Sequence, residues 1–216
     1  MVFKFASIHS VRLTKITVAT IALISTVLIA TPVFAHHAFG EIVPSNGVEG
    51  FLSGLAHPMI GLDHFAFVIA VGLLAATKRQ GFWLPVAFLL SALGGTGIHL
   101  FTLNLPAPEV FISFSVLAFG IMLAMQNRPN LPVLVGLGTI AGLFHGYAYG
   151  EAIIGASMAP LVAYLAGFTI IQLVIALSSY FIAKQIFNKP ESLRLRYAGF
   201  ILCGAGAAFL SAAILG

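Results

Sequence analysis

Apolar residues dominate six segments of the chain, each long enough to cross all or most of a lipid bilayer. A helix needs about 20 apolar residues to span the hydrocarbon core. Short polar stretches rich in Gly, Pro, Asn or basic residues separate the segments. The pattern predicts an all-α, polytopic membrane protein with six transmembrane helices. The predicted spans cover residues 51–76, 82–103, 110–125, 131–154, 161–186 and 197–215.

Composition supports the same class. Of the 216 residues, 60% are hydrophobic and only 7% are charged, whereas a soluble domain has about 25% charged residues. This excludes a soluble enzyme and a disordered protein. The basic residues lie in short separate clusters, which excludes a nucleic-acid binder. The apolar composition makes the lipid bilayer the expected environment. One cysteine excludes a disulfide framework.

Residues 1–35 have the features of a secretory signal peptide. Three basic residues precede an apolar core over residues 16–30, and Val33-Phe34-Ala35 fits a small-residue cleavage site. The alternative is an uncleaved transmembrane helix, but the apolar core is shorter than the ~20 residues needed to span. We therefore expect residues 36–216 to form the membrane domain, which starts at His36-His37.

Basic residues predict the orientation of the six spans. After residue 35 they follow only the first, third and fifth spans, a distribution that the positive-inside rule places in the cytoplasm. Both termini are then expected on the outer side, in agreement with a cleaved signal peptide. The basic residues in question are Lys78, Arg79, Arg128, Lys184, Lys189, Arg194 and Arg196.

Several ionisable residues lie within or near the predicted spans, where they are costly and therefore indicate function. No Lys or Arg is available inside the spans to pair with the carboxylates. At ~1.5 Å per residue, all fall in the outer half of the membrane, in two tiers. The deeper tier is Asp63, His64 and His145, and the shallower tier is His57, His99 and Glu151.

The spacing of these residues leaves open whether they form one site or two. His57 and His64 are seven residues apart, so a straight helix would separate them by about 10 Å. Pro58 and Gly61 make a straight helix doubtful. A lone membrane histidine is also often a hydrogen-bonded packing residue, and His99 and His57 fit either interpretation.

The residue types favour a transition metal. Imidazole with carboxylate suits Ni²⁺, Co²⁺, Zn²⁺, Cu²⁺ or Fe²⁺, whereas Mg²⁺ and Ca²⁺ prefer oxygen ligands. His36 and His37 could form an additional chelate at the mature terminus, or belong to a terminus without fixed structure. The glycines Gly142, Gly146 and Gly150 recur every four residues, which is typical of close helix packing.

A short internal similarity suggests two related halves. Residues 61–64 (GLDH) in the first span match residues 142–145 (GLFH) in the fourth. These are the first spans of two three-span halves that cross in opposite directions. Inverted repeats of this kind are common in secondary transporters, so the sequence predicts a 3+3 inverted repeat.

At these residues the chain resembles the HupE/UreJ family of nickel permeases. Residues 56–64 (AHPMIGLDH) are similar to the family's first-helix signature, and residues 144–151 (FHGYAYGE) to its second, in the fourth helix. The second motif commonly has His where Tyr149 stands, and its Glu lies one residue beyond Glu151. The resemblance implies that His57, Asp63, His64, His145 and Glu151 are the functional residues.

The resemblance implies secondary uptake of Ni²⁺ across the bacterial inner membrane, in support of hydrogenase or urease maturation. Some relatives carry cobalt, which would serve cobalamin synthesis. The ion is substrate, and no prosthetic group is expected. Two alternatives stay open: an intramembrane metal-dependent hydrolase, and a metal-binding assembly factor or sensor without transport. No HExxH helix or nucleotide-binding motif is present in the sequence.

Overall fold

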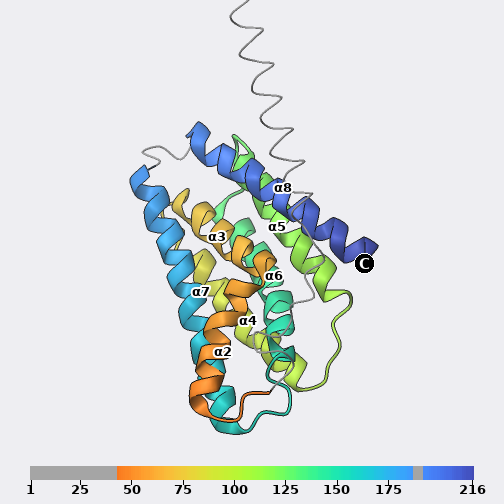
Figure 1. The fold of residues 1–216 in the computed structure, drawn as a ribbon. Coiled ribbons are helices and arrows are strands. Elements are labelled where there is room, and N and C mark those ends of the chain that lie inside the picture. The colour runs from red at the N-terminus through yellow and green to blue at the C-terminus, as the bar shows by residue number, and fades with distance from the viewer. Residues whose placement is uncertain (1–42, 187–191) are drawn as a thin grey trace, which may run out of the picture.

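The computed structural model describes residues 43–186 and 192–216, which form helices and no strands. The prediction of an all-α fold is therefore confirmed for these residues (Figure 1). The predicted signal peptide, His36, His37 and Lys189 lie outside the described residues. The helices are α2 (Gly47–Ile60), α3 (Leu62–Ala76), α4 (Trp83–Leu100), α5 (Pro108–Ala124), α6 (Leu131–Glu151), α7 (Met158–Ile186) and α8 (Leu193–Leu215).

The first predicted span is two helices, α2 and α3, bent by 79°. Helix α2 begins after Asn46, whose side chain accepts hydrogen bonds from two backbone amides of the first turn. It ends at Ile60, two residues after Pro58, and Gly61 takes an extended conformation (φ −69°, ψ 95°). The sequence therefore marked the break correctly at Pro58 and Gly61, although the segment starts at Gly47 rather than at Phe51.

The number of spans remains a prediction. By length and composition, α4, α6, most of α7 and α8 are able to cross a membrane, and the bent pair α2–α3 would be a fifth crossing. Helix α5 is apolar but has 17 residues, slightly fewer than the ~20 of a typical span. Helix α8 begins at Leu193 rather than at Tyr197, because the Ser192 side chain accepts from the Leu195 amide and caps it.

The helices pack in three groups: α4 with α6, α5 with α8, and α7 with both α2 and α3. Glycines permit the close approaches. A Cβ on Gly146 would collide with the Ala92 carbonyl, one on Gly72 with the Ala176 carbonyl, and one on Gly120 would lie 2.7 Å from the Cys203 amide. Gly142 and Gly150 also face α4, at Ser91 and His99 respectively. The glycine series on α6 is thus a packing surface.

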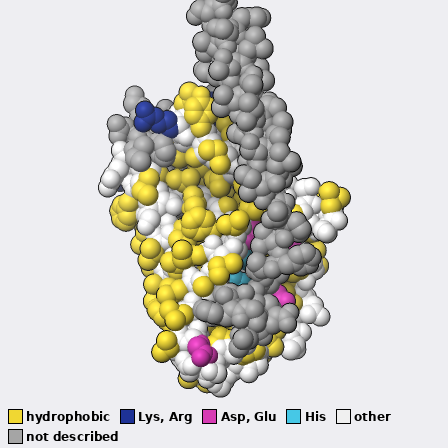
Figure 2. Space-filling view, in the orientation of Figure 1, with side chains coloured by type: hydrophobic (Ala, Val, Ile, Leu, Met, Phe, Trp, Pro, Cys, Tyr) yellow, Lys and Arg dark blue, Asp and Glu magenta, His cyan; other side chains and the backbone are white. Residues whose placement is uncertain are grey.

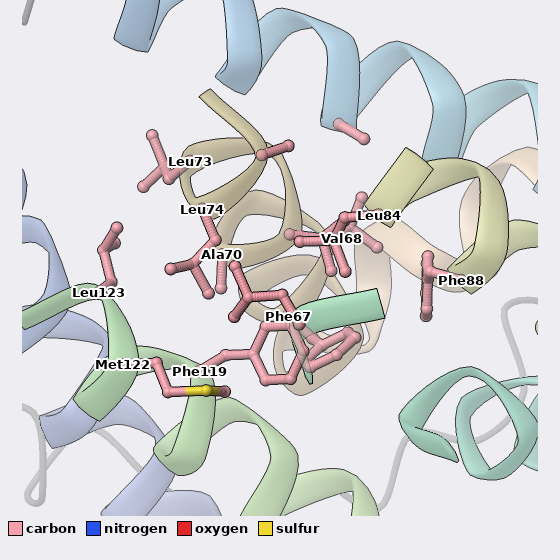
Figure 3. Close-up of a cluster of buried hydrophobic side chains, with 14 of the residues drawn as sticks. Phe67, Val68, Ala70, Leu73, Leu74, Leu84, Phe88, Phe119, Met122 and Leu123 are labelled. Carbon is pink, nitrogen blue, oxygen red and sulfur yellow. The ribbon is translucent and has the colours of Figure 1, made fainter. Parts of the chain in front are cut away.

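Two clusters of buried apolar side chains divide the interior. The larger lies around Phe67, Phe88 and Phe119, from α3, α4 and α5 (Figure 3). The smaller includes Tyr149, Tyr164 and Phe168 from α6 and α7. Polar side chains of the site described below lie where the two clusters meet.

The outer surface is suited to lipid. Large apolar side chains are exposed on several helices, such as Leu90 at 66% and Ile201 at 67%, a pattern that marks a membrane or protein contact. Figure 2 shows hydrophobic side chains over the middle of one face, with basic side chains near its upper end and an acidic side chain near its lower end.

Basic residues from three of the predicted cytoplasmic segments meet at the C-terminal end of α5. Lys78 Nζ donates to the Arg128 carbonyl (3.4 Å), Arg128 Nη2 to the Leu123 carbonyl (2.9 Å), and Arg196 Nε to the Ala124 carbonyl (2.9 Å). Partial burial and the nearby Arg128 charge lower the pKa of Lys78. Cations beside the free carbonyls of a helix C-terminus are favourable, so these contacts also stabilise the end of α5.

Candidate functional site

Three buried histidines converge inside the bundle. His57 lies in the last turn of α2, His64 in the first turn of α3, and His145 on α6; their exposed fractions are 4%, 2% and 0%. The bend between α2 and α3 brings the His57 and His64 rings to 6.0 Å, closer than the ~10 Å of a straight helix. His64 Nδ1 lies 2.7 Å from His145 Nδ1. The break in the first span therefore creates the cluster.

Aromatic rings and one hydroxyl hold His145 in place. Phe67 stacks on its imidazole at 4.4 Å between ring centroids, and Phe88 approaches edge-on at 5.8 Å. His145 Nε2 lies 3.0 Å from Ser115 Oγ. The Ser115 hydroxyl also donates to the Ile112 carbonyl, at 2.6 Å. Both nitrogens of His145 therefore have polar neighbours, although the side chain is fully buried.

The Tyr149 ring contacts both His57 and His64. Its ring centroid is 5.2 Å from that of His57 and 4.5 Å from that of His64. Its hydroxyl donates to Gln172 Oε1 (3.3 Å). The Tyr164 hydroxyl lies 3.0 Å from His57 Nδ1 and donates to the Tyr149 carbonyl at 2.8 Å. Tyr149 from α6 thus packs beside both histidine rings, and the Tyr164 hydroxyl from α7 holds His57.

The other candidate residues do not join this cluster. Asp63 is half-buried, and its Oδ1 accepts from the His64 amide at 2.8 Å, in the first turn of α3. The His99 ring lies 4.1 Å from that of Tyr147, tilted by 43°, and its Nδ1 is buried without a hydrogen-bond partner in the described part of the chain. Glu151 is exposed at the end of α6. Within residues 43–186 and 192–216, no three His, Cys, Asp or Glu side chains form a group able to hold one ion.

Sequence reasoning missed Ser115 and Tyr164, and it noted Tyr149 only as a difference from the family motif. Ser115 and Tyr164 are among several hydroxyl residues of the apolar helices α5 and α7, and nothing in the sequence distinguishes them from the others. Their importance follows from their partners, which are 30 and 107 residues away in the chain. Only the packing of α5 and α7 against the histidine helices reveals it.

The paired imidazoles allow two kinds of chemistry. At 2.7 Å the two Nδ1 atoms make an N–H···N hydrogen bond if one of them carries a hydrogen. If neither does, both lone pairs face the same point and can bind a cation, since neutral imidazole is the commonest protein ligand for transition metals. The site is buried and lies far from the basic cluster at the end of α5, so no side-chain cation there competes with a bound ion.

Comparison with known proteins adds a family assignment. The profile of the family described as HupE / UreJ protein matches residues 24–209. Among curated proteins, "Protein HupE" of Rhizobium leguminosarum bv. viciae is 31% identical over 184 residues, which cover 84% of this chain and 93% of that protein. No solved structure matches the chain.

Proposed function

Because the chain belongs to the HupE/UreJ family, we propose that it is a secondary transporter of a divalent transition-metal ion. The proposed cargo is Ni²⁺, with Co²⁺ next, moved from the outer side of the bacterial inner membrane into the cytoplasm. Such an ion would supply hydrogenase or urease maturation, or cobalamin synthesis in the case of cobalt. The proposal joins the family assignment to the chemistry of the buried histidines.

The observation that carries the proposal is the His64–His145 pair. Two nitrogens 2.7 Å apart subtend about 80° at an ion with bonds of ~2.1 Å, the length found for zinc and imidazole nitrogen. This is close to the right angle between neighbouring ligands in octahedral or square-planar coordination, the geometries of Ni²⁺ and related ions. The arrangement therefore supports binding of a transition metal between α3 and α6.

The number of ligands favours transport over catalysis or sensing. A catalytic zinc site generally has three protein ligands, whereas in the described part of the chain the pair offers two nitrogens and no third ligating side chain is grouped with them. An ion in transit must bind well enough to enter and weakly enough to leave. Two buried imidazoles, with the His57 ring 6.0 Å from that of His64, suit successive weak binding.

The proposed route begins on the outer side. His36 and His37, Glu151 and His99 would supply the first contacts before the ion reaches His57. From there it would pass Tyr149 and bind His64 and His145.

Rocking of two halves would then open the path inward. The helix pairing supports this step. In the predicted repeat, α2–α3 corresponds to α6, α4 to α7, and α5 to α8. Under this correspondence the α3–α7 contact is equivalent to the α6–α4 contact, and the α5–α8 contact is equivalent to itself. The inverted repeat itself stays a proposal.

The direct test is uptake of radiolabelled Ni²⁺ at trace concentration, in cells without their own importers. Cells with the chain should accumulate label above cells with an empty vector, and unlabelled Co²⁺ should compete more strongly than Zn²⁺. Absence of flux for all three ions would overturn the transport proposal. Metal content of the purified protein would then distinguish a metal-binding enzyme or sensor from a protein that binds no metal.

A glycine at the helix break provides a prediction that leaves the histidines intact. A Cβ on Gly61 would lie 2.6 Å from His64 Cδ2, and the ring is confined between His145 and Tyr149. We expect Gly61→Ala to displace the imidazole and raise the KM for nickel uptake about tenfold, the scale of a disturbed ligand support. Gly97→Ala is the matched control, because no atom lies within 4 Å of its added Cβ. Equal KM values in the two variants would contradict the prediction.

A further inference from the structure

We infer that Ser115 and Tyr164 are positioning residues of the transport site. This inference rests on the proposed function. Each accepts the N–H of one imidazole and thereby selects its tautomer. His145 then presents Nδ1 to the ion, and His57 presents Nε2. Two hydroxyls, on α5 and α7, would thus determine which nitrogens bind metal.

The tautomer of His145 follows from counting hydrogens. A serine hydroxyl has one hydrogen, and a carbonyl oxygen can only accept. Ser115 Oγ lies 2.6 Å from the Ile112 carbonyl, so its hydrogen is used there. The second contact, 3.0 Å to His145 Nε2, therefore requires that the imidazole donates. Neutral His145 carries its hydrogen on Nε2, and its lone pair lies on Nδ1.

The same reasoning applies to His57. The Tyr164 hydroxyl donates its one hydrogen to the Tyr149 carbonyl at 2.8 Å. Its oxygen must then accept from His57 Nδ1, at 3.0 Å. Neutral His57 is consequently the Nδ1–H tautomer, and its lone pair lies on Nε2. In both cases a backbone carbonyl orients a hydroxyl, and the hydroxyl orients an imidazole.

His64 is the member whose state must change when the ion binds. Because His145 Nδ1 has a lone pair and no hydrogen, the 2.7 Å contact between the two Nδ1 atoms requires His64 to donate in the metal-free protein. An ion bound between the pair would replace that hydrogen bond, and the His64 hydrogen would move from Nδ1 to Nε2 so that the neutral ring keeps one N–H. Ser115 keeps His145 ready for this exchange, since the Nε2 hydrogen cannot move to Nδ1 without losing its acceptor.

This arrangement corresponds to the outer-shell support of known metal sites. A ligating histidine commonly donates its second N–H to an oxygen, which fixes the tautomer and ring orientation, and loss of that partner typically costs 10–100-fold in affinity or activity. Without the Ser115 hydroxyl, a buried N–H would lack its acceptor. The imidazole could then adopt the tautomer whose Nδ1 is blocked.

The experiment measures KM and maximal rate for nickel uptake at equal membrane abundance. Ser115→Ala should raise KM 10–100-fold and leave the maximal rate at saturating nickel within about twofold. Ser115→Thr, which keeps the hydroxyl, should restore KM. Ser113→Ala is the matched control, because Ser113 is also buried, at 3% exposed against 7% for Ser115, and lies on the same helix. Ser115→Ala with the KM of the wild type, or equal effects of Ser113→Ala and Ser115→Ala, would overturn the inference.

Tyr164 is tested in the same way. Tyr164→Phe removes the acceptor of His57 but keeps the ring, and it should also raise KM 10–100-fold. Tyr180→Phe, on the same helix α7, is the control and should leave KM unchanged. If wild type gives no flux, the transport proposal fails separately. Equilibrium dialysis of Ni²⁺ against the purified proteins then decides the positioning role, which is supported by weaker binding in Ser115→Ala than in Ser113→Ala and overturned by equal binding.

Discussion

Replacing His64 by alanine should reduce the initial rate of nickel uptake by more than about 100-fold, beyond the usual cost of losing a ligand's support. The change removes one of the two imidazoles at the centre of the site and leaves His145 Nδ1 facing a cavity. His145→Ala should have an effect of the same size, because the two nitrogens lie 2.7 Å apart and would bind one ion. The measurement is labelled uptake at equal membrane abundance.

The double variant identifies whether the pair acts as a unit. Residues that act together are strongly non-additive, so His64→Ala combined with His145→Ala should transport no more slowly than either single variant. A double variant whose loss equals the product of the single losses would show that the histidines bind independently. Uptake above about a tenth of the wild-type rate in either single variant would contradict the central role of the pair.

The second large effect concerns the packing of α4 against α6. Gly146 is buried against the Ala92 carbonyl, and a Cβ at this position would overlap that backbone atom. Valine would force the two helices apart and disturb the 2.8 Å hydrogen bond from Thr96 Oγ1 to the Gly146 carbonyl. Overpacking of this kind costs about 3 kcal/mol, or a Tm lower by roughly 10 °C. Thermal unfolding of the protein in detergent would measure it.

Gly136→Val is the matched control for this prediction. Gly136 lies on the same helix, is exposed, and has no atom within 4 Å of an added Cβ. Its Tm should stay within about 3 °C of wild type, because valine exceeds glycine in helix propensity by only a few tenths of a kcal/mol. Equal melting temperatures for the two variants would show that α4 and α6 are less closely packed than described.

Much of the architecture could be predicted from local sequence. Long apolar runs indicated the helices, because a segment of this hydropathy is stable only in lipid or buried in a protein core. Pro58 and Gly61 indicated the interruption of the first span, since proline lacks an amide hydrogen and glycine leaves a helix readily. The spacing of Gly142, Gly146 and Gly150 indicated a packing surface, which the structure confirms against α4.

The candidate site was predicted only in part. Ionisable residues in apolar segments identified His57, His64 and His145, because their burial cost implies a use. The same criterion selected His99 and Glu151, which lie elsewhere on the bundle. The cost of placing an ionisable group in a membrane does not indicate which way its side chain points. Counting residues along a helix estimates only the depth of a side chain in the membrane. Side chains that bind one ion must also lie close together in the other two directions.

What the sequence by itself determined is therefore the helical membrane class, the break at Gly61 and the identity of the buried histidines, all of which depend on neighbours within a few residues. Only the tertiary structure decided that a 79° bend turns His57 and His64 toward one another, and that His145 meets them from α6. Only it paired Ser115 and Tyr164 with those imidazoles. The physical reason is that hydrogen bonds act over about 3 Å, and their partners here are separated by 30 to 107 residues of chain.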